Sequence, residues 1–469
     1  MLKSIEPLRR SAFAAVLTLF AAATVALPVR AAAAGTQTWL VVSDIHLDPF
    51  DRRPHPSLFG SDTNLALFRS ALAEMRRRVP DPAEVLLPGD FLAHDFTSRA
   101  RRAGFAGSGA AGIETMRLIA DAFAQAYPRA RFAVALGNND GPCGDYRTAF
   151  SSRFAAAVAR IWQPLVDRGN AAPGFAESFT ANGSYVASSP QRGTRFVVFD
   201  DVPLSSMYRG SCTDATSTGP ESQVDWLDAT LASTPPGTAN VVLMHVPAGY
   251  DVFSTERTHG YFPWPFLEAG ATARLLSAFS NRANRVAFVV AGHAHRFDVR
   301  IADGISTIVF GSLSPVYHNN PAFYTLEVGP GGEPRDVRVF AFDEWTQSWQ
   351  PARSFDAKWR APSLNAKALG ALHARLGTDP ALRQAWDAAS SGWPSNGHIA
   401  WSTWGDAWRV PWCAQQYSGD GFAACAQLVA RAESFRAGLA AMAFVAGAVI
   451  AGIALIPARR RRTERPNGD

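Results

Sequence analysis

Residues 39–46 have the sequence WLVVSDIH, and the fold prediction starts from them. Its apolar residues run without interruption up to Ser43, which is the pattern of a short strand buried on both faces. Asp44 and His46 follow at once, so a carboxylate and an imidazole stand where the strand ends. The stretch therefore predicts a buried strand that delivers polar side chains to one edge of a sheet.

The same arrangement recurs along the chain. Apolar runs in AEVLLPGD (83–90), RFAVALGNND (131–140), TANVVLMHVP (238–247) and RVAFVVAGHAH (285–295) end in Asp90, Asn138, His245, His293 and His295. RFVVFDD (195–201) and ISTIVFGS (305–312) are further expected strands, and helical patterns cover 64–78, 113–127 and 221–231. Strands that alternate with helices predict an α/β fold. Because ligands bind at the carboxyl ends of strands in such sheets, the polar side chains should converge.

The converging side chains are carboxylates, imidazoles and an amide. These are the donors that Zn²⁺, Mn²⁺ or iron binds in proteins. A single His after a strand is usually structural, and DxH alone is a weak signal. Five such blocks in order, each at a strand end, are much more specific. The sequence therefore predicts a metal centre built from Asp44, His46, Asp90, Asn138, His245, His293 and His295.

The blocks DIH, GDFLAHD, GNND, MHVP and GHAH resemble the calcineurin-like metallophosphoesterase superfamily. GDFLAHD with its His94, and Asn319–Phe323 (NNPAF), resemble the acid sphingomyelinase and sphingomyelinase-like phosphodiesterase branch. The resemblance covers about residues 38–345. It implies a calcineurin-like β-sandwich flanked by helices, followed by a helical C-terminal subdomain.

The resemblance also implies roles for the metal-binding residues. Asp44, His46 and His295 would hold one metal, Asn138, His245 and His293 the other, and Asp90 would bridge them. Two cations about 3.5–4 Å apart can activate a shared water or hydroxide for in-line attack on phosphorus and neutralise the phosphoryl oxygens. The expected cofactors are therefore two divalent ions, with zinc favoured over manganese or iron.

Position 139 departs from the family pattern. The family usually has His after the Gly-Asn pair, and that His contacts the phosphate or protonates the leaving group, whereas this chain has Asn139. An amide donates a hydrogen bond but no proton. Either His94 is then the sole general acid, or the leaving group needs little protonation. GNND also resembles endopolyphosphatase-like relatives. Asp95 either orients His94 or caps the next segment.

Both ends of the chain read as targeting segments. Residues 1–34 have the charged, apolar and small-residue order of a signal peptide. Residues 438–457 form an uncharged run long enough to span a bilayer, and the basic segment 458–469 would stay in the cytoplasm. Between them we expect a catalytic domain at 35–345 and a helical subdomain at 346–433. The protein should then be exported and membrane-anchored, with the catalytic domain in the periplasm or extracellular space.

Charge and cysteine content narrow the class of partner. The formal net charge is +5, but each targeting segment contributes about three positive charges, so the body is close to neutral. This excludes a general nucleic-acid-binding surface. Four cysteines in an exported chain suggest two disulfides. Three pairings are possible, and Cys413–Cys425 with Cys143–Cys212 is the favoured one.

The sequence thus predicts a dinuclear-metal-dependent phosphohydrolase, with phosphodiesterase activity favoured. Its substrate would be a phosphorylated small molecule, nucleotide, polyphosphate or lipid. A polyphosphatase or nucleotide pyrophosphatase is the enzymatic alternative, favoured by Asn139. A non-catalytic metal-containing binding protein is the alternative of another class.

Overall fold

The computed structural model describes residues 35–454 except 214, 217–218, 259–261, 356–358, 360, 394–407 and 420. Its centre is a pair of packed sheets. The first has the strand order β14 (Ser348–Trp349), β13 (Glu333–Asp343), β12 (Ala322–Gly329), β1 (Gln37–Val41), β4 (Glu84–Leu87), β5 (Arg131–Val134), and β15 (Arg353–Ser354) pairs with β13. The second has the order β10 (Asp298–Ala302), β11 (Ile305–Val309), β9 (Val286–Ala291), β8 (Ala239–Leu243), β7 (Thr194–Val198), β6 (Tyr185–Ser188). A small pair joins β2 (Leu47–Asp48) to β3 (Thr63–Asn64).

The strands of the second sheet are buried on both faces. In β8, Val241 belongs to the core between the sheets, whereas Val242 belongs to a second core on the outer side. Because side chains alternate across a strand, a continuous apolar run fills both cores. On the inner side, the Trp39 ring of β1 packs against Phe196 of β7 at 5.1 Å between ring centroids. The predicted β-sandwich is therefore confirmed.

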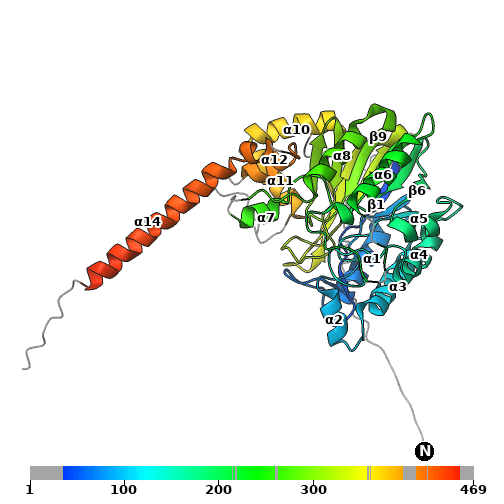
Figure 1. Ribbon diagram of the computed structural model, residues 1–469, viewed down its shortest axis with the longest axis horizontal. Helices are drawn as coiled ribbons and strands as arrows, with labels where there is room; N and C mark the ends of the chain where they lie inside the picture. The colour runs from blue at the N-terminus through cyan, green and yellow to red at the C-terminus, as the bar shows by residue number, and fades with distance from the viewer. Residues whose placement is uncertain are drawn as a thin grey trace, which may run out of the picture.

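Helices cover the outer faces of both sheets (Figure 1). Those of the second sheet's outer core are α6 (Pro220–Ala232) and α8 (Ala269–Ser280). The first sheet is covered by α1 (Leu65–Arg78), α3 (Ser108–Ala126) and α4 (Arg153–Val166). The remaining helices are α2 (Phe96–Arg102), α5 (Phe175–Asn182), α7 (Val252–Arg257), α10 (Ala366–Thr378), α11 (Pro380–Ser390), α12 (Arg409–Ala414), α13 (Gly421–Cys425) and α14 (Leu428–Ala454).

Local sequence explains where the helices begin. Asn64 caps α1, since its side chain accepts a hydrogen bond from the Leu67 backbone N–H at 2.9 Å. In the C-terminal subdomain, α10 and α11 are separate helices, because Asp379 caps α11 and Pro380 opens it. In contrast, α3 begins at Ser108, several residues before the expected start, and the antiparallel strands β12 and β13 were not anticipated.

Both favoured disulfides are present. Cys143 pairs with Cys212 across 69 residues, and Cys413 pairs with Cys425 across 12. The second one closes a short loop in the C-terminal helical part, next to a small apolar cluster that includes Val410 and Phe422. The chosen pairing is confirmed.

The structure contradicts the prediction of a C-terminal transmembrane helix. Within the described residues, no helix combines the length and the apolarity that a membrane crossing requires. Glu433 and Arg436 add charge to the first part of α14, which the apolar run continues. The fold prediction, the membrane partner and the membrane anchoring are corrected accordingly. Segments 1–34 and 458–469 lie outside the described residues.

Candidate metal centre

The seven predicted metal-binding residues meet at one place. Three parallel strands of the first sheet (β1, β4 and β5) and two of the second (β8 and β9) end there. At the centre lies the Asp90 carboxylate, whose Oδ2 is 3.3 Å from Nε2 of His46 and 3.3 Å from Nε2 of His245. Asp90 therefore stands between an imidazole from each sheet.

The other residues divide into two groups around Asp90. On one side, His295 Nε2 lies 3.5 Å from Asp44 Oδ1 and 3.1 Å from His46 Nε2. On the other side, His245 Nε2 lies 3.1 Å from Asn138 Oδ1. His293 joins this second group, since its ligand atom and those of Asp90 and His245 lie within 4.8 Å of one another.

The backbone at the centre is held in an uncommon conformation. Five of the seven residues have a positive φ between 43° and 68°: Asp44, His46, Asp90, His293 and His295. A non-glycine residue in this region costs about 1–3 kcal/mol and is kept where the surrounding structure imposes it. Two glycines permit the close packing, because a Cβ on Gly137 would meet Asp90 Oδ1 at 2.1 Å and one on Gly292 would meet Ser43 Oγ at 2.2 Å.

Backbone carbonyls fix the orientation of two imidazoles. His46 Nδ1 lies 3.0 Å from the Leu92 carbonyl, and His245 Nδ1 lies 2.9 Å from the Pro88 carbonyl. Because a carbonyl only accepts, each Nδ1 carries a proton, and each Nε2 is the nitrogen that faces Asp90. This is how metal-binding histidines are usually oriented.

The electrostatics of the centre suit a bound cation. Burial raises the pKa of Asp44 to about 6 and lowers the pKa values of His46 to about 4 and His293 to about 3. Neutral imidazole is the form that binds metals. Burial also opposes protonation of His245, but the Asp90 carboxylate outweighs it and raises the pKa of His245 to about 10. A cation would supply the positive charge that this proton supplies, so the donor set fits a metal.

His94, the candidate general acid, lies beside the centre. Its ring stacks on His46 at 4.1 Å between centroids, and about a quarter of its side chain is exposed. Its Nδ1 lies 2.8 Å from Asp62 Oδ1, and Arg99 in turn donates to Asp62 Oδ2 at 2.7 Å. Burial opposes protonation, but the bond to Asp62 and its charge raise the pKa of His94 above its usual value. The orienting carboxylate is thus Asp62, not Asp95.

Asn139 does not point into open space. Its backbone N–H and its side-chain amide both donate to Asp90, at 2.8 Å each, and only 4% of the residue is exposed. Its Oδ1 is buried without a hydrogen-bond partner. The departure from the family pattern therefore places a second donor on the central carboxylate.

Sequence reasoning missed two carboxylates. Asp62 is 32 residues from His94 and follows no strand motif, so no local signal marked it. Asp140 is the last residue of GNND, and it accepts backbone N–H bonds from Gly137, Asp90, Phe91 and Leu92 at 2.7–3.2 Å. It thereby joins the loop after β4 to the loop after β5. Its place directly after Asn138 and Asn139 was the signal that could have found it.

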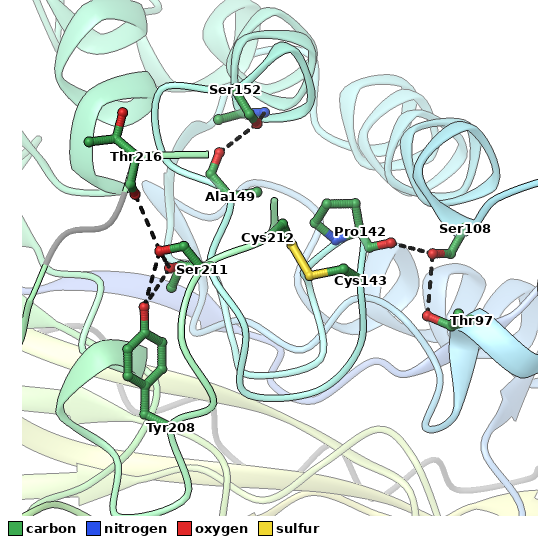
Figure 2. Close-up of a disulfide and its surroundings, with 12 residues drawn as sticks. Thr97, Ser108, Pro142, Cys143, Ala149, Ser152, Tyr208, Ser211, Cys212 and Thr216 are labelled. Carbon is green, nitrogen blue, oxygen red and sulfur yellow. Dashed lines mark hydrogen bonds between the residues drawn. A yellow bond between two sulfur atoms is a disulfide. The ribbon is translucent and has the colours of Figure 1, made fainter. Parts of the chain in front are cut away.

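The disulfide Cys143–Cys212 secures the loop that follows Asn138 (Figure 2). The Cys212 N–H donates to the Thr148 carbonyl at 2.8 Å, and the Thr148 hydroxyl lies 2.8 Å from the Tyr208 hydroxyl. The backbone N–H of Tyr146 donates to the Asn138 carbonyl at 2.8 Å. Cross-links on this loop limit how far Asn138 can move.

Tyr317, Asn319 and Asn320 lie in the loop between β11 and β12. The Tyr317 ring meets that of His295 edge to face at 4.6 Å and is 40% exposed. Asn319 donates to Ser312 Oγ at 3.0 Å, and Asn320 donates to the Gly392 carbonyl at 3.0 Å. Tyr317 thus lies at the site, whereas both asparagines are buried in structural hydrogen bonds.

Two packed sheets whose strand ends gather buried imidazoles and carboxylates define the metallophosphoesterase class. The chain belongs to the calcineurin-like phosphoesterase family, whose model matches residues 38–297.

Two relatives confirm the resemblance to the sphingomyelinase-like branch. The "Sphingomyelinase phosphodiesterase D" of Dictyostelium discoideum is 24% identical over 276 residues, which is 56% of this chain and 57% of that protein. The "Cyclic GMP-AMP phosphodiesterase SMPDL3A" of Mus musculus is 26% identical over 219 residues, which is 44% of this chain and 46% of that protein. The matches thus span about half the length of these relatives.

Among solved structures, a putative 5'-nucleotidase from Staphylococcus aureus matches with a TM-score of 0.37 and 12% identity. The match covers 68% of this chain and 54% of that one. A score this low carries no weight for the fold or the function.

Proposed function

We propose that the chain is an exported phosphodiesterase that hydrolyses a small-molecule or lipid phosphodiester with two divalent cations, zinc or else manganese or iron. The observation that carries the proposal is the position of Asp90, 3.3 Å from imidazoles of both sheets. Two relatives are phosphodiesterases by name, which favours the diester class. Two disulfides support export, because such bonds persist in oxidising compartments.

In this proposal the seven residues share out two cations. Asp44, His46 and His295 would hold one, Asn138, His245 and His293 would hold the other, and the Asp90 carboxylate would serve both. When bound, the cations supply an activated water and neutralise the charge on the phosphoryl oxygens. Asn139 steadies Asp90 through two hydrogen bonds, and Asp140 holds the two loops that carry these residues.

His94 delivers the proton to the leaving oxygen in this proposal. Its Nδ1 is occupied by Asp62, so its Nε2 is the nitrogen left to face the substrate. An alkoxide leaving group needs such a proton, and general acid catalysis contributes about 10²–10⁴-fold in rate. Asn139 supplies none, so the chain relies on a single imidazole for this step.

A phosphoanhydride hydrolase is the second candidate, and Asn139 is the observation that favours it. A phosphate leaving group needs little protonation, so an amide in place of the family's His would cost it little. Replacing Asn139 with His discriminates the two. Higher activity of the variant on alkyl diesters supports the phosphodiesterase proposal. If activity rises on no substrate with an alcohol leaving group, the phosphoanhydride hydrolase is favoured.

The test is a metal assay and a substrate panel on the purified full-length chain. We expect two divalent ions per chain and turnover of bis-p-nitrophenyl phosphate, with sphingomyelin and a cyclic dinucleotide as candidate natural diesters. Polyphosphate and nucleoside triphosphates test the second candidate. The Arg274→Ala variant is the control, because Arg274 pairs only with exposed carboxylates of α6. Two bound metals with no diester hydrolysis would refute the phosphodiesterase proposal.

A further inference from the structure

A cleft of about 610 Å³ opens beside the metal centre and shares His293 with it. Pockets of about 300–1,000 Å³ accommodate organic ligands, so this volume exceeds what a phosphate group alone requires. The cleft therefore has room for one of the organic groups of a phosphodiester, next to the place where the phosphorus would lie.

Aromatic rings line the part of the cleft nearest the metal centre. The Phe266 ring meets that of His293 edge to face at 5.1 Å, and the Phe253 ring lies 5.4 Å from Tyr317. Tyr317 and Trp264 are 40% and 39% exposed, although both are large aromatic residues. Exposed rings around a cavity provide stacking surfaces for a flat or apolar group.

The charged side chains of the cleft do not favour a long polyanion. Arg300 pairs with Asp298 at 3.2 Å and donates to the Ala414 carbonyl at 2.6 Å. Arg257 lies over the Phe253 ring at 5.4 Å. Asp251 is a further carboxylate of the lining. Recognition of a chain of phosphates requires several uncompensated cations, and carboxylates would repel it.

One wall of the cleft depends on a loop outside the family match. The wall is α7 with the residues just before it, and the Tyr250 ring stacks on that of Phe422 at 4.1 Å and an angle of 13°. The Tyr250 hydroxyl also donates to the Gly419 carbonyl at 3.1 Å. Phe422 and Gly419 lie in the loop that the disulfide Cys413–Cys425 closes.

The same loop also contacts β10, whose Asp298 and Arg300 line the cleft. Gln415 donates from Nε2 to Asp298 Oδ1 at 2.9 Å, and the Ile301 N–H donates to the Gln415 carbonyl at 2.7 Å. The Ala414 carbonyl accepts from Arg300. A single cross-linked loop thus contacts both the residues before α7 and β10, two segments at the cleft.

We propose that this cleft binds the aromatic or apolar organic group of the substrate, and that the Cys413–Cys425 loop sets its shape. The proposal rests on the proposed phosphodiesterase function, since the metal centre would hold the phosphorus of the same substrate. The family model matches residues 38–297. The proposal therefore assigns substrate selectivity to a segment outside the matched residues.

The test compares two phosphonates that differ only in their organic group, phenylphosphonate and methylphosphonate, by calorimetry on the zinc-loaded full-length chain. Both present the same anion to the metals, so the ratio of their affinities reports the cleft. We expect phenylphosphonate to bind about tenfold more tightly, because stacking on aromatic residues contributes about 1–3 kcal/mol and 1.4 kcal/mol is tenfold.

Three variants test which residues produce the preference for phenylphosphonate. Phe253→Ala removes a ring of the wall, Tyr250→Phe removes only the hydroxyl bond to Gly419, and the Cys413→Ser/Cys425→Ser double variant opens the loop. We expect the affinity ratio to fall toward one in Phe253→Ala and the double variant, and by about twofold in Tyr250→Phe. Arg274→Ala should keep the wild-type ratio.

The outcomes separate this proposal from the proposed function. Equal affinities for the two phosphonates in the wild type, or a ratio unchanged by Phe253→Ala, would overturn the cleft assignment whether or not the enzyme turns over diesters. A wild-type ratio that only Phe253→Ala lowers would overturn the role of the loop. If phenylphosphonate is preferred but no diester is hydrolysed, the cleft stands and the phosphodiesterase function fails.

Discussion

The metal centre and the cleft share His293, yet they are built in different ways. The centre draws its residues from short loops directly after five strands, within 44–295. The cleft draws on α7, β10 and α11, and on a loop near the C-terminus that contacts β10 and the residues before α7. Sheet register fixes the centre, whereas contacts between distant segments fix the cleft. We therefore expect catalysis to tolerate few substitutions at the metal centre, and substrate selectivity to tolerate more substitutions at the cleft.

The same contrast applies to the two disulfides. Cys143–Cys212 secures the loop after Asn138, beside the metal centre, whereas Cys413–Cys425 secures the loop at the cleft. Loss of the first should weaken metal binding, and loss of the second should change ligand preference. Substitutions at the metal centre, beside it and in the C-terminal helices test whether chemistry and ligand preference are separable in this way.

Replacing Asp90 with Asn should have the largest effect. The variant removes the carboxylate that stands between His46 and His245, so the cation at Asn138, His245 and His293 would lose its anionic ligand. We expect kcat on bis-p-nitrophenyl phosphate to fall at least about 10³-fold, since metal-ion catalysis contributes several kcal/mol. Turnover assays with elemental metal analysis measure both changes. Retention of two metals and of wild-type activity would contradict the proposed centre.

Replacing His94 with Asn should remove the proton donor and leave the metals bound. We expect a loss of about 10²-fold or more on a diester with an alkyl leaving group. The loss should be much smaller with p-nitrophenolate, which leaves without a proton. Parallel kinetics on the two diesters check this. Equal losses on both would instead indicate that His94 supports the structure of the centre.

Replacing Asp62 with Asn should have a smaller effect in the same direction. Asp62 acts through His94, whose Nδ1 it contacts at 2.8 Å, and Asn still accepts a hydrogen bond there. We expect kcat on the alkyl diester to fall about tenfold, with little change in KM. In the double variant with His94, the losses of the two single variants should not add. A full, independent loss in that double variant would argue against a shared role.

The smallest effect concerns pH and the C-terminal helices. Burial lowers the pKa of His373, which stacks on Trp412 at 4.4 Å beside Cys413. In the unfolded chain this histidine binds a proton near pH 6.5, whereas the folded chain resists protonation. Stability should therefore be complete above pH 6.5 and fall as the pH drops below it. Denaturation of wild type and His373→Gln at pH 7.5 and 5.5 measures the difference, and an equal pH dependence would contradict it.

The sequence was most informative where chemistry and strand ends coincide. Asp44, His245 and His293 each follow an apolar run, and the alternation of Val241 and Val242 between two cores explains why such runs are continuous. Asp62 had no comparable signal, because its partner His94 is contributed by another loop.

From the sequence come the buried strands, the blocks that resemble the family and the set of candidate metal-binding residues. These follow from local periodicity and from residue types at fixed offsets, which survive in one dimension. Tertiary packing alone reveals that Asp62 orients His94, that Asn139 donates to Asp90, and that the Cys413–Cys425 loop contacts both Tyr250 and Asp298. Such contacts join residues dozens to more than a hundred positions apart, and packing, not local pattern, brings them together.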